Sequence, residues 1–134
     1  MVRVVAAMLC EENRFLICQR PPHKTRGLLW EFVGGKVEAG ETDEVALKRE
    51  CMEELGVEIA IDEYRTSQIH EYPDMTIELV LYRGHVIEGE LQQLEHADLR
   101  WIPVEDIPKY TFCPADIDIM EYLYKNGLYN TDAQ

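Results

Sequence analysis

The sequence predicts an α+β fold in which a β-sheet lies between helices. Short apolar runs bounded by turn residues predict strands, and two longer segments, residues 43–55 and 115–125, have the pattern of helices. A length of 134 residues with 46% hydrophobic residues suits a chain that buries one sizeable core. We therefore expect residues 1–134 to form a single domain.

The N-terminal third is predicted to begin with a β-hairpin. Residues 2–9 and 14–19 are short apolar runs on either side of a polar turn at residues 11–13. Residues 21–27 contain Pro, Thr and Gly and are predicted to be a loop. Residues 28–33 then lead into the pair Gly34 and Gly35.

The C-terminal half is predicted to contain further strands and a second helix. Residues 57–61, 64–72 and 75–86 have strand-like patterns, and Pro73 and Asp74 form the expected turn between the last two. Residues 99–102 are another expected strand. The second helix, residues 115–125, is expected to begin after Pro114 and to end near Gly127.

The helix over residues 43–55 has recognisable end signals. Thr42 can cap its N-terminus, and Asp43 and Glu44 suit the positive end of the helix dipole. Gly56 stands where a left-handed residue commonly ends a helix. These signals indicate that the helix begins and ends as the periodicity predicts.

Three carboxylates are expected on one side of this helix. At about 100° per residue, Glu50, Glu53 and Glu54 fall within an arc of about 100°. Such like charges repel unless a hard cation neutralises them, and oxygen ligands suit Mg²⁺ or Mn²⁺. The alternative is a solvated charged face, which is the usual interpretation of an acidic run. The opposite side, expected to pack on the core, holds Val45, Cys51, Met52 and Leu55.

The spacing of these residues carries a family resemblance. From Gly35 the order is five residues, Glu41, seven residues, Arg49 and Glu50, two residues, Glu53 and Glu54, one residue, and Gly56 followed by Val57. This order resembles the complete Nudix box of the Nudix hydrolases. Seven fixed identities coincide by chance about once in 10⁸ starting positions. Cys51 stands where the family more often has a larger aliphatic residue.

The resemblance implies a fold and a set of roles. The Nudix fold is an α/β/α sandwich with a central mixed sheet flanked by helices, and the box forms a loop, a helix and a loop. The resemblance implies metal ligation by the three Glu side chains and the Gly34 carbonyl oxygen, with Arg49 orienting the carboxylates. It further implies the following roles: Glu41 joining loop and helix, Gly35 and Gly56 forming the turns, and Lys36 contacting a phosphate.

A further carboxylate outside the box is expected as a metal ligand or general base. Residues 94–101 resemble the corresponding loop of MutT-like members, and we choose Glu95 from it. Asp98 is the rival, and a simple loop acid is the alternative interpretation of Glu95. We expect His96 to be an exposed loop histidine, because a hard metal held by carboxylates has little need of imidazole.

Segments on both sides of the box resemble MutT-like nucleoside triphosphate pyrophosphohydrolases. Residues 19–21 and 27–36 resemble the entry to the box, with Val33 in place of the usual proline. Arg20 is expected near the nucleobase or a phosphate. Phe32 is expected either to stack on the base or to belong to the core.

Asp116 is the candidate for reading the nucleobase. Residues 112–116 resemble the place where these enzymes meet the base, with Asn or Asp at this position. An ionised carboxylate only accepts hydrogen bonds, whereas a protonated one also donates, so cytosine and guanine edges both fit. The alternative interpretation is an acid placed at a helix N-terminus by the dipole.

Charge and composition restrict the partners. A formal charge of −13 argues against binding to a nucleic-acid polymer, which requires stripes of Lys and Arg. No apolar run is long enough to span a bilayer, and the first residues look like a strand rather than a signal peptide. The four cysteines form no C-x-x-C pair. We expect a cytoplasmic enzyme, monomeric or homodimeric, with a nucleoside triphosphate as substrate.

The resemblance implies Mg²⁺-dependent hydrolysis of nucleoside triphosphates to the monophosphate and pyrophosphate, with Mn²⁺ as a possible substitute. An oxidised purine such as 8-oxo-dGTP is the first choice of substrate, and CTP, dCTP or 5-methyl-dCTP is the second. ADP-ribose and nucleotide sugars rank lower, because the chain is short. A non-catalytic nucleotide sensor is the alternative outside enzymes, and the intact acidic residues of the box argue against it.

Overall fold

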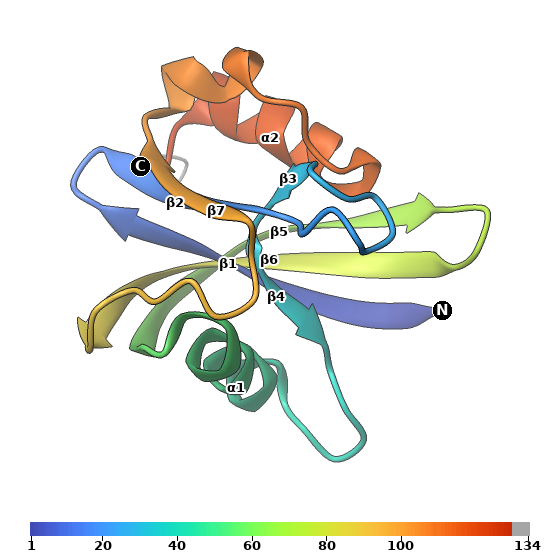
Figure 1. Ribbon diagram of the computed structural model, residues 1–134, viewed down its shortest axis with the longest axis horizontal. Coiled ribbons are helices and arrows are strands. Elements are labelled where there is room, and N and C mark those ends of the chain that lie inside the picture. Colours follow the sequence, from blue (N-terminus) through green and yellow to red (C-terminus); the bar gives the residue numbers. More distant parts are fainter. Residues whose placement is uncertain (130–134) are drawn as a thin grey trace.

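The computed structural model describes residues 1–129 and shows a mixed sheet between two helices (Figure 1). The predicted α+β sandwich is confirmed. In chain order the elements are β1 (Val2–Glu11), β2 (Arg14–Gln19), β3 (Trp30–Glu31), β4 (Val33–Lys36), α1 (Asp43–Leu55), β5 (Glu58–Glu71), β6 (Thr76–Glu88), β7 (Asp98–Ile102), the 3₁₀ helix η1 (Val104–Lys109) and α2 (Pro114–Asn126).

β1 is the centre of the sheet. It pairs in parallel with β6 along one side, and β5 follows β6 in an antiparallel arrangement. On its other side β1 pairs with two antiparallel strands, β4 against its first half and β2 against its last residues. β2 in turn pairs with β3 and β7. The strand order places β4, which leads into the box loop, directly beside the central strand β1.

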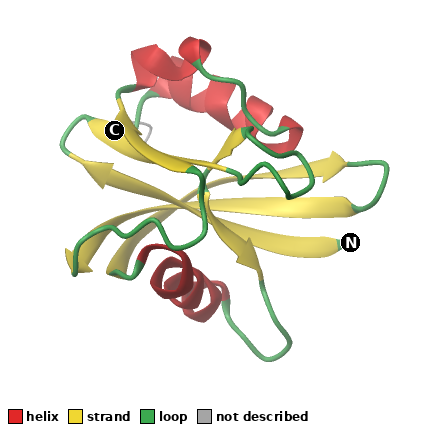
Figure 2. Ribbon diagram, viewed as in Figure 1, coloured by secondary structure: helices red, strands yellow, loops and turns green. Residues whose placement is uncertain are grey.

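Alternating side chains of β1 build two separate cores. Val5, Ala7 and Leu9 pack on the α1 side, whereas Ala6 and Met8 pack on the α2 side. This period of two is what a strand buried on both faces requires. α1 and α2 therefore cover opposite faces of the sheet (Figure 2).

Most predicted elements are present, with three differences. Residues 57–61 and 64–72 are one strand, β5, because register shifts at Glu58/Ile59, Ile61/Glu63 and Tyr64/Thr66 absorb the irregular pattern. Residues 28–36 contain two short strands, β3 and β4. The turn η1 was not predicted, since Pro108 inside it breaks any helical pattern.

α1 begins and ends where the sequence predicts. The Thr42 side chain accepts a hydrogen bond from the Val45 backbone N–H, and Gly56 has a φ of 69°. The prediction that Val45 and Met52 pack on the core is wrong, because they are 53% and 50% exposed. The helix instead buries Ala46 and Leu47 beside Cys51 and Leu55, so its buried side is rotated toward Glu54.

A buried arginine of the sheet is hydrogen-bonded to the residues that follow α2. Arg65 on β5 has a side chain only 1% exposed and donates hydrogen bonds to the backbone carbonyls of Gly127, at 3.2 Å, and Leu128. Glu63 lies 3.7 Å from the same guanidinium. The charge therefore has partners although it is out of water.

Replacing Arg65 by Met is expected to lower the free energy of unfolding by about 2–4 kcal/mol, since two buried carbonyls lose charged donors. Urea unfolding measures this difference. Arg14→Met is the control, because Arg14 is 46% exposed and its ion pair with Glu11 lies in solvent. Equal stabilities of the two variants would contradict the role of Arg65.

None of the helices within residues 1–129 combines the length and the apolar composition needed to cross a bilayer.

Candidate active site

A cavity of about 530 Å³ opens between α1, the loop that precedes β3, and the N-terminus of α2. Its size is typical of a small-ligand site. The residues predicted from the sequence to bind metal or substrate line it, namely Arg20, Phe32, Gly34, Lys36, Glu50, Glu53, Glu54, Glu95 and Asp116, together with the turn residue Gly35. Arg49, Glu41 and Gly56 lie outside the lining.

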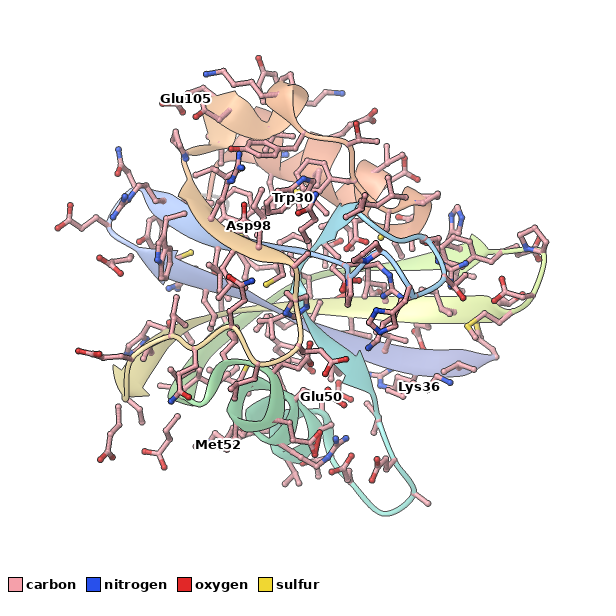
Figure 3. All side chains as sticks on the ribbon, viewed as in Figure 1. Trp30, Lys36, Glu50, Met52, Asp98 and Glu105 are labelled. Carbon is pink, nitrogen blue, oxygen red and sulfur yellow. The ribbon has the colours of Figure 1, made fainter. Side chains whose placement is uncertain are left out.

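Gly34 of β4 allows a close approach that no other residue permits, and Gly35 leaves room for the Glu50 carboxylate. A Cβ on Gly34 would stand 2.0 Å from the carbonyl oxygen of Val5, where β4 pairs with β1. A Cβ on Gly35 would stand 2.6 Å from the carboxyl carbon of Glu50. Figure 3 shows Glu50 on the side of α1 that faces β4, with Met52 on the opposite side. Because glycine has no side chain, β4 and the Glu50 carboxylate can lie close together.

Arg49 holds the acidic side chains of the box in place. Its guanidinium donates to both carboxylate oxygens of Glu41, at 2.7 and 2.9 Å, and to Glu50 at 2.9 Å. Longer bonds run to Glu53 at 3.4 Å and to the Lys36 carbonyl at 3.2 Å. The hydrogen bonds from Arg49 lower the pKa of Glu41 to about 2. One arginine therefore joins loop and helix and orients two carboxylates at the cavity.

Glu54 is the most unusual carboxyl group of the cavity. Its residue is 9% exposed, and its Oε2 atom is buried without a hydrogen-bond partner. Burial raises the pKa of Glu54 to about 10, and a hydrogen bond to Glu50 together with the negative charges of Glu50, Glu31 and Glu95 adds to the effect. A cation beside these groups would relieve both the repulsion and the unmet hydrogen bond.

The donors fit a hard divalent cation. Within residues 1–129, no three Asp, Glu, His or Cys side chains already surround one point. The cavity nevertheless collects carboxylates of Glu50, Glu53 and Glu54 from one helix, and Oε2 of Glu54 is free to bind. Such oxygen donors suit Mg²⁺ or Mn²⁺.

The structure separates the two candidate acids outside the box. Glu95 lines the cavity and forms an ion pair with Lys24 from the opposite loop, and its hydrogen bond with Lys24 lowers its pKa. Asp98 instead pairs with Arg100 at 3.0 Å, outside the cavity lining. The geometry favours Glu95 over Asp98.

Sequence reasoning missed two residues of the cavity. Glu31 lies between Trp30 and Phe32 and lines the cavity, and an isolated acid between two aromatic residues was the available signal. The prediction of an exposed His96 is wrong, because its side chain is 1% exposed. His96 stands beside Glu54 and Glu31, a contact that only the folded loop creates.

The end of the cavity away from α1 combines a buried acid with aromatic side chains. Asp116 is 6% exposed, and burial raises its pKa well above the usual range. Arg20 donates to Glu31 at 3.1 Å. Phe32 lines this end and also belongs to the core on the α2 side, and its stacking on a base stays a prediction. The Tyr72 ring stacks with Arg26, whose guanidinium lies 3.8 Å from the ring centre.

Comparison with known proteins identifies the family. The sequence profile of the NUDIX domain matches residues 1–123. The chain belongs to the Nudix family. The CTP pyrophosphohydrolase of Escherichia coli is 40% identical over 121 residues, which cover 90% of each chain. The 8-oxo-dGTP diphosphatase of Proteus vulgaris is 37% identical over 93 residues, covering 69% of this chain and 83% of the relative.

The solved structures agree with this assignment. The solution structure of the E. coli ORF135 protein is similar with a TM-score of 0.82 at 37% identity, covering 98% of this chain and 95% of the other. The protein is thus a Nudix hydrolase, a nucleotide pyrophosphohydrolase of the MutT-like type. Nudix hydrolases generally use divalent metal ions, which agrees with the acidic cavity.

Proposed function

We propose that the protein hydrolyses nucleoside triphosphates to the monophosphate and pyrophosphate with Mg²⁺, and that it prefers cytosine nucleotides such as CTP, dCTP or 5-methyl-dCTP. The observation that carries this choice is the deep burial of Asp116 at the end of the cavity away from α1, which we call the nucleoside end. Mn²⁺ is expected to substitute for Mg²⁺.

The end of the cavity beside α1, which we call the phosphate end, has the groups needed for phosphoanhydride hydrolysis. A bound Mg²⁺ would neutralise phosphate charge and lower the pKa of an attacking water. Glu50, Glu53 and Glu54 would hold it, with the Gly34 carbonyl as a further ligand, while Lys36 provides a point charge for a phosphate. Glu95 lies across the cavity, where it can accept the proton of the water or complete the ligand set.

The choice of base follows from the proton on Asp116. Burial favours the neutral acid, which donates one hydrogen bond and accepts another. Cytosine presents an acceptor at N3 beside a donor at N4, which pairs with such an acid. Guanine presents two donors at N1 and N2, which pair with an ionised carboxylate. The buried Asp116 therefore favours cytosine.

8-oxo-dGTP is the second candidate, although the sequence alone placed it first. The nearby Arg20 lowers the pKa of Asp116, and so does the hydrogen bond from the Phe32 backbone N–H, so both oppose the effect of burial. The 37% identical diphosphatase also acts, by its name, on this nucleotide. An ionised Asp116 would accept hydrogen bonds from the oxidised purine.

A turnover screen decides between these candidates. Purified protein with Mg²⁺ is given normal, oxidised and methylated nucleoside triphosphates, ADP-ribose and a nucleotide sugar, and products are identified by chromatography. We expect release of CMP and pyrophosphate, with kcat/KM for CTP or dCTP about tenfold or more above that for any purine. A higher kcat/KM for 8-oxo-dGTP than for every other nucleotide would establish the second candidate. No turnover of any triphosphate with Mg²⁺ or Mn²⁺ would refute the proposed activity.

A further inference from the structure

Two neighbouring side chains of the cavity carry buried polar atoms without partners. Within residues 1–129, such atoms belong to Glu54, His96 and Arg65. For His96 both ring nitrogens are affected. Buried polar groups are nearly always hydrogen-bonded, so each exception requires an explanation. The unpartnered atoms of Glu54 and His96 have a common explanation, because the two side chains face one another in the same cavity.

The loop that carries His96 is hydrogen-bonded to α1 and to β2. The Leu94 backbone N–H donates to the carbonyl of Glu54 at 3.4 Å, and the Ala97 N–H donates to the carbonyl of Gln19 at 2.9 Å. These bonds flank His96 on both sides. The backbone of His96 is therefore held close to Glu54.

His96 connects the carboxylates of two different elements. Its Nε2 atom lies 3.3 Å from Oε1 of Glu54 on α1 and 3.6 Å from Oε2 of Glu31 on β3. The other oxygen of Glu31 accepts a hydrogen bond from Arg20 at 3.1 Å. A row of side chains thus runs from Arg20 through Glu31 and His96 to Glu54, from the nucleoside end of the cavity to the phosphate end.

We propose that His96 is a positioning residue, which donates a hydrogen bond from Nε2 to the Glu54 carboxylate and turns the free Oε2 atom toward the cavity. The proposal rests on the proposed function, in which Oε2 of Glu54 binds the divalent ion. The 3.3 Å separation of Nε2 and Oε1 already allows a hydrogen bond, and a small rotation of the imidazole or the carboxylate aligns the N–H with Oε1. Residues that hold a metal ligand in this way commonly contribute 10–100-fold to affinity or activity.

The competing explanation is that His96 only fills space beneath the loop. Two variants separate the explanations. His96→Gln keeps an N–H donor near the position of Nε2, whereas His96→Leu keeps most of the volume and removes the donor. The matched control is His85→Leu, because His85 on β6 is 47% exposed and lies outside the cavity lining.

The first readout is the affinity for Mn²⁺ alone, measured by electron paramagnetic resonance without nucleotide. We expect about tenfold or greater loss for His96→Leu, and a value within about threefold of the unaltered protein for His96→Gln and His85→Leu. With CTP and Mg²⁺, His96→Leu should lower kcat by a similar factor and leave KM nearly unchanged. Unchanged Mn²⁺ affinity of His96→Leu, or equal losses in the Leu and Gln variants, would overturn the proposal.

A second measurement requires no substitution. Nitrogen-15 chemical shifts of the imidazole in the unaltered protein, saturated with Mg²⁺ so that Glu54 is ionised, show which ring nitrogen carries a proton. A proton on Nε2 is expected, since this atom faces both carboxylates. A proton on Nδ1 alone would refute the proposal even if the variants failed to fold. Failure of the triphosphate screen would instead refute the proposed function, because Mn²⁺ affinity and tautomer are measured without nucleotide.

Discussion

Replacing Glu54 by Gln is expected to lower kcat for the best nucleotide about a thousandfold or more, while the chain still folds. Gln has the same shape, but its amide lacks the charge that holds a divalent ion. Lewis-acid stabilisation by such an ion contributes several kcal/mol to the transition state, and each 1.4 kcal/mol is about a factor of ten in rate. Steady-state kinetics at saturating Mg²⁺ measures the loss.

The matched control for Glu54→Gln is Glu44→Gln on the same helix. Glu44 has a side chain 62% exposed and pairs with Lys48 at 3.0 Å, away from the cavity. We expect its kcat to stay within about twofold of the unaltered protein, because exposed ion pairs contribute little. Turnover by Glu54→Gln near that of Glu44→Gln would remove Glu54 from the metal site.

The same substitution has a pH signature in the absence of metal. The pKa of Glu54 is about 10 in the folded protein and 4.5 for an ordinary Glu carboxyl. Between these values the folded state keeps a proton that the unfolded chain has lost, so stability falls as pH rises through this window. In EDTA, Tm of Glu54→Gln should therefore fall less with rising pH than Tm of the unaltered protein. A steeper fall for the variant would contradict the buried acid.

Replacing Asp116 by Ala is expected to change the ranking of nucleotides rather than the metal requirement. Loss of a buried group that pairs with the base should lower kcat/KM for CTP about a hundredfold, since the base edge then remains unpaired. The Mg²⁺ dependence should stay unchanged, because Asp116 lies at the nucleoside end of the cavity. Competition between CTP, dGTP and 8-oxo-dGTP measures the ranking.

Asp116→Asn distinguishes the two protonation states. Asn donates and accepts, as the neutral acid does, so turnover of CTP should stay within about threefold. An ionised carboxylate would instead be mimicked poorly by Asn, and purine turnover would suffer most. The control is Asp118→Asn on α2, since Asp118 is exposed and contacts Gln68. An unchanged ranking in Asp116→Ala would refute the role of Asp116 in reading the base.

The sequence by itself determined the box and its helix. The spacing of the box acids, the Thr42 cap and Gly56 are local features, because helix geometry relates residues that are close in the chain. The same local logic predicted the hairpin of β1 and β2. The resemblance to MutT-like enzymes separately identified residues of other segments that line the cavity, such as Arg20 and Asp116.

Only the tertiary structure decided the environment of each group. His96 is expected at the surface because a hard metal has little need of imidazole, an argument that takes no account of how the loop packs. Val45 and Met52 are expected in the core because periodicity gives relative angles and does not say which side of a helix meets the sheet. The pairing of β4 with β1 fixes that side. Burial of Glu54, Asp116 and His96 depends on chain segments far apart in sequence, whose contact is set by packing of the whole sheet, and this burial raises the pKa of the two acids.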